Sequence, residues 1–134
     1  MYSKYDITTA KWGEVKEMGH YDMAILPWGA TEPHNLHLPY CTDMLTAQAV
    51  AFEVAEKAAM QGVNLMVLPG IPLGSQNPGQ IELPYCIHTS QTTQMAILRD
   101  VVRSLKRQGI HKLMIMSGHG GKNFKGMIRV IMIV

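Results

Sequence analysis

The stretch Asp22-Met23-Ala24-Ile25-Leu26-Pro27 is a short apolar run that ends at a proline and is followed by Gly29. A run of this length and composition is typical of a buried parallel strand that leads into a loop. The pattern occurs twice more, at residues 64–70 (NLMVLPG) and 112–118 (KLMIMSG). Three similar runs predict three strands of one sheet.

Helical periodicity separates these runs. Apolar residues recur at steps of three and four between residues 47 and 58 and again between residues 97 and 105. Gly62 and Gly109 stand where the C-terminal caps of these helices are expected. The alternation predicts an α/β fold with a mainly parallel sheet, right-handed crossovers and helices packed on its faces. Ligands of such sheets bind beyond the carboxyl ends of the strands.

The composition is that of one globular domain, with 134 residues of which 47% are apolar and 16% are charged. A formal net charge of +2 argues against a dedicated nucleic-acid binder. The apolar runs are far shorter than the ~20 residues of a membrane span. The N-terminus shows no signal-peptide pattern, so we expect a cytoplasmic protein in which Cys41 and Cys86 are free thiols.

The C-terminal third is basic. Eight of the twelve Lys and Arg residues lie between Arg99 and Arg129, where Asp100 is the only acid. A solvated helix face is the favoured interpretation, and an anion site or a surface for an acidic partner are the alternatives.

Metal-binding side chains gather after the first and third predicted strands. Glu32, His34, His37 and Asp43 lie within twelve residues, and His119 follows the third strand. Imidazole and carboxylate groups together favour zinc, manganese or iron, and the scarcity of thiolates argues against a closed structural zinc site. The spacing alone fits a polar loop that merely contains histidines equally well. His119 favours the ligand interpretation, because its flanking glycines allow a close backbone approach.

Residues 117–123 (SGHGGKN) are also similar to a phosphate-binding loop. The nucleotide-binding pattern requires a glycine and a hydroxyl where the chain has Met116 and Asn123. Nucleotide binding is therefore disfavoured, although backbone amides at a helix start could hold an oxyanion or a carboxylate.

Two motifs of the chain resemble those of a known family. The first is WGATEPH at residues 28–34 with HLP at 37–39 and TD at 42–43, and the second is SGHGG at 117–121. In this order they resemble the G-[SA]-x-E-x-H-x-x-H-L-P segment and the N-G-H-G-G-N turn of the creatininase family of metal-dependent amidohydrolases. Ser117 and Lys122 depart from the second motif. The resemblance implies a three-layer α/β sandwich with a mainly parallel sheet.

The resemblance also implies roles for individual residues. Glu32, His34, Asp43 and His119 match metal ligands of the catalytic centre, with Asp43 as the bridging aspartate. One or two divalent ions per chain are expected, zinc first, with manganese or iron as alternatives. In creatininase a glutamate two residues after the turn histidine completes the second metal site; Gly121 stands there, which argues against creatinine as the substrate.

The sequence indicates candidate substrate contacts less clearly than candidate metal ligands. His37 matches a motif position usually outside the direct metal ligands, where it would orient a ligand, touch substrate or serve the structure alone. Trp28 and Tyr40 are candidates for the wall of a substrate pocket, although aromatic residues beside a loop are more often core or rim.

We therefore expect a metal-dependent hydrolase that cleaves a linear or cyclic amide C–N bond of a small molecule, in a homo-oligomer without nucleic-acid or membrane partners. Residues 1–134 correspond to about the first half of a family domain, so we expect a truncated single domain whose apolar C-terminal residues 127–134 are buried. The alternative is a catalytically impaired half-domain that binds metal or acts as an assembly module. A third interpretation is an anion-binding, flavodoxin-like module that uses the basic C-terminal third.

Overall fold

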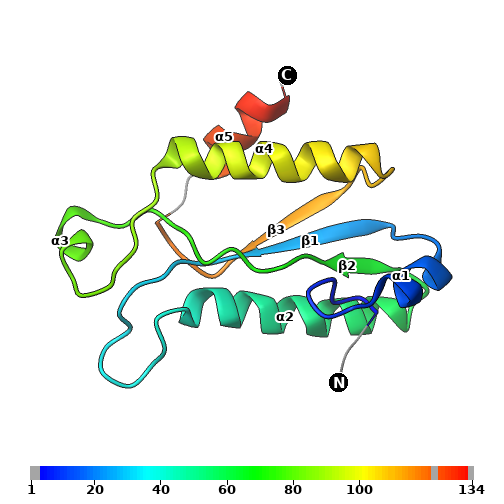
Figure 1. The fold of residues 1–134 in the computed structure, drawn as a ribbon, viewed down its shortest axis with the longest axis horizontal. Coiled ribbons are helices and arrows are strands. Elements are labelled where there is room, and N and C mark those ends of the chain that lie inside the picture. The colour runs from blue at the N-terminus through cyan, green and yellow to red at the C-terminus, as the bar shows by residue number, and fades with distance from the viewer. Residues whose placement is uncertain (1–3, 122–123, 133–134) are drawn as a thin grey trace.

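The sheet is the middle layer of the fold. The computed structural model describes residues 4–121 and 124–132. Three parallel strands, β1 (Met23–Trp28), β2 (Leu65–Val67) and β3 (Leu113–Ser117), lie in the order β2-β1-β3 (Figure 1). Met23 pairs with Leu65, and Trp28 pairs with Ser117. The three predicted strands and the α/β fold class with a parallel sheet are confirmed.

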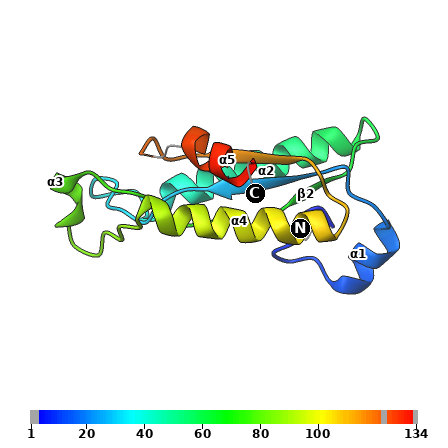
Figure 2. The same ribbon diagram turned by 90° about the horizontal axis from the view of Figure 1, so that it is seen from above.

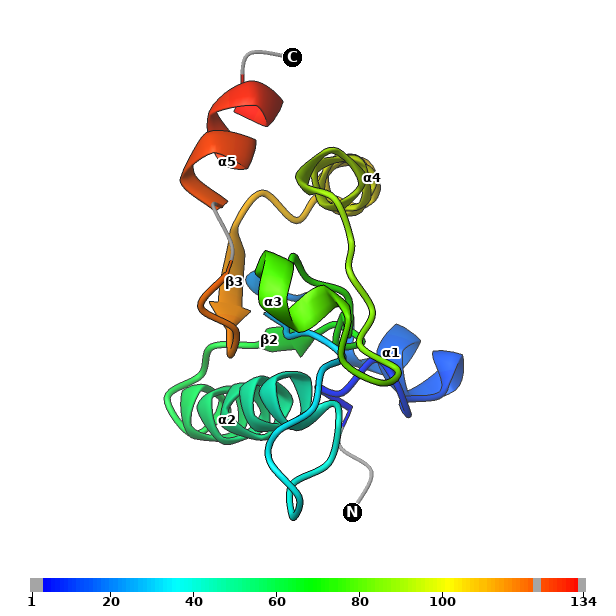
Figure 3. The same ribbon diagram turned by 90° about the vertical axis from the view of Figure 1, so that its left-hand side faces the viewer.

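Helices cover both faces of the sheet. Helix α2 (Thr42–Ala59) lies under one face, and α4 (Gln91–Arg107) lies over the other (Figures 1 and 3). The chain passes from β1 to β2 in one direction and from β2 to β3 in the other. Right-handed crossovers in opposite directions place their helices on opposite faces, and this accounts for the three layers.

Three shorter helices complete the fold. Helices α1 (Trp12–Met18) and α5 (Phe124–Met132) share core clusters with Leu105 and Leu98 of α4, respectively. Helix α3 (Pro78–Ile81) lies in the loop between β2 and α4 (Figure 2). None of the helices within the described residues has the length and apolar character needed to cross a bilayer.

Strand β1 is central and carries the core on both of its faces. Ile25 packs with Ala51 and Ala55 of α2, whose small side chains let the helix lie close to the sheet. Leu26 and Trp28 alternate to the opposite face. Burial on both faces explains why this strand reads as a continuous apolar run.

The predicted glycine caps are confirmed. Gly62 and Gly109 adopt φ of +79° and +80°, a conformation that glycine accepts without strain. After α4, the amide of Ile110 donates to the carbonyl oxygen of Leu105 at 3.0 Å, which satisfies a free acceptor of the helix end.

The N-terminal region contains structure that the sequence pattern did not predict. The amide of Ile7 donates to the carbonyl oxygen of Val67 at 3.0 Å, and the amide of Val67 donates to the carbonyl oxygen of Tyr5 at 2.7 Å. Residues 5–7 therefore cover the outer edge of β2. Helix α1 has only seven residues and none is fully buried, although Val15 and Met18 pack partly buried against the core.

At the C-terminal end, burial is partial. Met127 is buried against the core, whereas Ile128 is 40% exposed. Lys122, Asn123, Ile133 and Val134 lie outside the described residues.

Candidate metal centre

The predicted ligand residues meet at the carboxyl ends of β1 and β3. The loop after β1 leads to α2 on one face of the sheet, and the loop after β3 leads to α5 on the other. Neighbouring strands whose connections leave to opposite faces open a crevice between their ends, where ligands of α/β proteins bind. Glu32 and His34 lie in the first loop, Asp43 in the first turn of α2, and His119 in the second loop.

Two glycines allow α2 to approach this edge closely. A Cβ atom at Gly29 would overlap the backbone of Met44, and one at Gly118 would overlap the carbonyl group of Asp43. The first turn of α2 therefore lies directly against the ends of β1 and β3. This contact brings the Asp43 carboxylate into the crevice.

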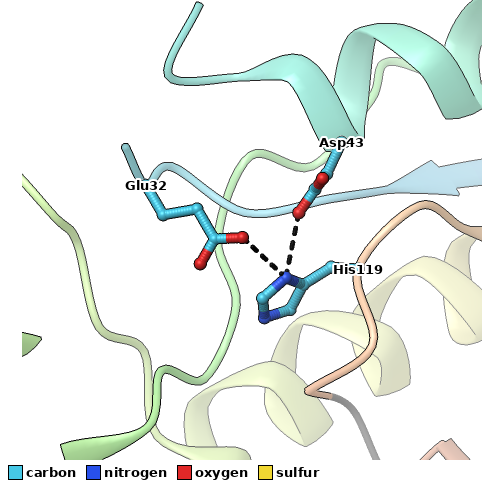
Figure 4. Close-up of side chains that lie close together, drawn as sticks. All are labelled: Glu32, Asp43 and His119. Atoms are coloured by element: carbon cyan, nitrogen blue, oxygen red, sulfur yellow. Dashed lines mark hydrogen bonds and ion pairs between the residues drawn. The ribbon is translucent and has the colours of Figure 1, made fainter. Parts of the chain in front are cut away.

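His119 faces two carboxylates (Figure 4). Its Nδ1 lies 2.9 Å from Oδ2 of Asp43 and 3.1 Å from Oε1 of Glu32. Its Nε2 lies 2.8 Å from the carbonyl oxygen of Ser75, which can only accept, so Nε2 carries a hydrogen and donates it. A ring nitrogen so close to two carboxylates calls for positive charge, either a proton on Nδ1 or a metal ion between the three groups.

His34 uses its two ring nitrogens in the same way, one on a backbone carbonyl and one on Asp43. Its Nδ1 donates to the carbonyl oxygen of Glu32 at 3.0 Å, and its Nε2 lies 2.8 Å from Oδ1 of Asp43. The two oxygens of Asp43 thus face different histidines, as a bridging carboxylate would. Burial alone would lower the pKa of His34, but the bonds to Asp43 and to the Glu32 carbonyl and the charges of both carboxylates raise it, and the net shift is upward.

The residues fit a divalent metal ion. Oε2 of Glu32 is buried and has no hydrogen-bond partner within the described residues, which is costly for a carboxylate unless a cation satisfies it. Glu32, Asp43 and His119 each offer one ligand atom, and these atoms lie within 4.8 Å of one another. Each histidine has its other nitrogen fixed by a backbone carbonyl, as metal-binding histidines usually do. The donor set suits zinc, manganese or iron.

A pocket of about 390 Å³ adjoins the centre. Its lining combines two candidate ligand residues with polar residues of the β2–α4 loop, and it comprises Glu32, Ser75, Asn77, Gln80, His119, Gly120 and Gly121. Sequence reasoning missed Ser75, Asn77 and Gln80, because neither their spacing nor their residue types set them apart from an ordinary polar loop.

The three predicted substrate contacts do not line this pocket. Trp28 is fully buried, donates from its indole nitrogen to the carbonyl oxygen of Leu73 at 2.7 Å and packs edge-on against Phe124. Tyr40 is 38% exposed, and its hydroxyl donates to the carbonyl oxygen of Pro84 at 3.0 Å, which joins the β1–α2 loop to the β2–α4 loop. His37 is exposed.

Two further sequence features are also located. Ser117, a departure from the family motif, accepts from the amide of His119 at 3.4 Å and donates to its carbonyl oxygen at 2.9 Å, so it braces the turn. Cys41 and Cys86 are free thiols. Burial and the nearby charge of Glu32 raise the pKa of Cys86.

Fold and site together define an α/β protein with a candidate divalent-metal centre at the carboxyl edge of a parallel sheet. The sequence profile of the creatininase family, described as creatinine amidohydrolase, matches residues 8–132. The chain belongs to the creatininase family.

Individual relatives agree with this assignment. A creatinine amidohydrolase of Pseudomonas putida is 30% identical over 99 residues, which are 71% of this chain and 36% of that protein. A Bacteroides fragilis crystal structure, provisionally assigned as a creatinine amidohydrolase, is 56% identical with a TM-score of 0.95, over 99% of this chain and 53% of that one. A mutant creatininase in a zinc–zinc form is 25% identical with a TM-score of 0.81, over 98% and 52%. The chain thus spans about half the length of these solved structures.

Proposed function

We propose that this chain carries the metal centre of an amidohydrolase that cleaves a C–N bond of a small linear or cyclic amide. The observation that carries the proposal is the convergence of both histidines on the Asp43 carboxylate, beside a buried Glu32 oxygen that has no partner in the part of the chain that the structure describes. A divalent ion supplies positive charge that polarises a carbonyl group and a lower pKa for water. Zinc is the first candidate, because a solved relative is a zinc–zinc form.

The chain's own residues have two tasks in this proposal. Glu32, His34, Asp43 and His119 hold the ion, and the carbonyl oxygens of Ser75 and Glu32 orient the two imidazoles. Asn77 and Gln80 border the pocket, where their side-chain amides can both donate to and accept from an amide substrate. A pocket of about 390 Å³ admits a small molecule.

The test measures metal content per chain and hydrolysis of a panel of linear and cyclic amides. Asp43→Asn keeps the shape of the side chain but removes the charge that both histidines face, so we expect loss of most bound zinc and of activity. His37→Ala is the control, because His37 is exposed and lies outside the pocket lining; it should keep its zinc. Full metal content in Asp43→Asn, with zinc or with manganese, would contradict the proposal.

A second candidate is the alternative that the sequence also left open, a family member that binds metal without catalysis. In this alternative the chain binds metal through the same residues but does not turn over amides, and it acts as a metal-binding or assembly module. Stoichiometric zinc together with no hydrolysis of any amide in the panel would favour it.

A further inference from the structure

Gln94 is a polar residue on the core-facing side of α4. It is 1% exposed, and the residues one turn and three turns further along the helix, Leu98 and Leu105, are buried apolar core. Burying a primary amide is unfavourable unless its hydrogens find acceptors. Nε2 of Gln94 donates to Oγ of Ser75 at 2.7 Å and to the carbonyl oxygen of Thr89 at 2.8 Å, so both hydrogens are used.

These bonds fix the backbone around Ser75. The Ser75 hydroxyl donates to the carbonyl oxygen of Thr89 at 3.0 Å, and the amide of Thr89 donates to the carbonyl oxygen of Gly74 at 2.9 Å. The next link is the carbonyl group of Ser75 itself, which accepts from Nε2 of His119 at 2.8 Å. Ser75 therefore links α4 to the ring nitrogen opposite the Asp43 and Glu32 carboxylates, because its side chain accepts from Gln94 and its backbone carbonyl accepts from His119.

Gly121 provides an independent observation on the same contact. A Cβ atom at this position would lie 2.8 Å from Nε2 of His119 and 2.9 Å from the carbonyl oxygen of Ser75. Both distances are too short for a carbon atom, so the bond between the imidazole and the carbonyl requires a residue without a side chain beside it.

We propose that Gln94 is a positioning residue for His119. By holding the Ser75 carbonyl in place, it keeps the hydrogen on Nε2 and directs Nδ1 at the two carboxylates. Loss of the Gln94 donors frees Ser75 to shift, and the imidazole then loses its fixed orientation. The consequence for metal affinity rests on the proposed function, whereas the consequence for the Nε2 hydrogen does not.

The first test uses the metal-free protein. The exchange of the His119 Nε2 hydrogen with water, followed by 15N-edited NMR, reports the bond to Ser75 in either ionisation state of the ring. Gln94→Met keeps the length of the side chain but has no donor, and we expect exchange faster by about tenfold or more. Leu98→Ala removes buried volume from the same helix but no hydrogen-bond donor to Ser75, so it controls for general loss of stability.

The second test measures zinc affinity by competition with a chelating dye. We expect Gln94→Met to weaken binding roughly 10- to 100-fold, the usual effect of removing a group that orients a metal ligand, and Leu98→Ala to change it little. Wild-type exchange and wild-type affinity in Gln94→Met, or equal effects of Leu98→Ala, would overturn the proposal. If the wild-type protein binds no zinc, the proposed function fails, and the exchange measurement still decides the role of Gln94.

Discussion

Each histidine of the centre commits one ring nitrogen to a backbone carbonyl and turns the other towards Asp43. For His34 these are Nδ1 on the Glu32 carbonyl and Nε2 on Asp43; for His119 they are Nε2 on the Ser75 carbonyl and Nδ1 on Asp43. Since a carbonyl oxygen only accepts, the hydrogen on the first nitrogen is fixed, and the second is left for a cation. The backbone carbonyls of Glu32 and Ser75 therefore decide which ring nitrogen of each histidine faces Asp43.

A pH dependence follows from the raised pKa of His34. In the metal-free protein, protonated His34 pairs with Asp43, and this stabilisation is fully present below the unfolded pKa of about 6.5 and is lost as the pH rises through the higher folded value. We expect the difference in unfolding free energy between wild type and His34→Gln, measured by urea denaturation with a chelator present, to shrink as the pH rises above about 6.5.

Zinc affinity should have the opposite pH dependence to this metal-free stabilisation. Protons compete with the metal for the imidazole, so zinc affinity should rise with pH across the same range. If the metal-free difference in unfolding free energy between wild type and His34→Gln instead grows above pH 6.5, protonated His34 has no stabilising partner in the folded protein.

At the scale of elements, the centre depends on how closely a helix end meets two strand ends. Asp43 belongs to α2, which packs on one face of the sheet through Ala51 and Ala55. Only the absence of side chains at Gly29 and Gly118 lets its first turn reach the carboxyl edge. The strand ends, the start of α2 and the candidate ligand residues thus form one structural unit.

Gly118→Ala tests this contact. Its methyl group would collide with the Asp43 carbonyl group, so we expect a loss of about 1–3 kcal/mol in unfolding free energy, together with weaker zinc binding. Gly120→Ala is a matched control in the same loop, because a Cβ atom there meets no atom of residues 4–121 or 124–132 within 4 Å. Chemical denaturation and zinc titration of both variants measure the two effects. Equal behaviour of the two alanine variants would contradict a close contact between β3 and α2.

At the scale of the whole molecule, the centre joins segments that are distant in the chain. The bond between His119 and Asp43 connects residues 76 positions apart, and the bond between His119 and Ser75 spans 44 positions. A ligand that binds such a site only in the folded state stabilises all three layers at once.

Metal removal should therefore lower the stability of the entire domain. With free zinc 100-fold above its dissociation constant, binding adds about 2.7 kcal/mol, which corresponds to a rise of roughly 10 °C in Tm for a domain of this size. Thermal melts with zinc and with a chelator measure the shift. Asp43→Asn should show almost none, and an equal shift in that variant would mean that zinc binds elsewhere.

The amino-acid sequence by itself determined the three parallel strands, the two long helices, the glycine caps and the grouping of Glu32, His34, Asp43 and His119. These features depend on short-range periodicity and on motifs that follow directly after strands, and parallel strands bring their carboxyl ends to one edge in any fold of this class. Tertiary structure alone decided which ring nitrogen faces Asp43, that Trp28 is core, and that Ser75 and Gln94 support the site. The physical reason is that these outcomes rest on hydrogen bonds and packing between distant segments, where residue type fixes what a group can bond but only the assembled fold decides which group it meets.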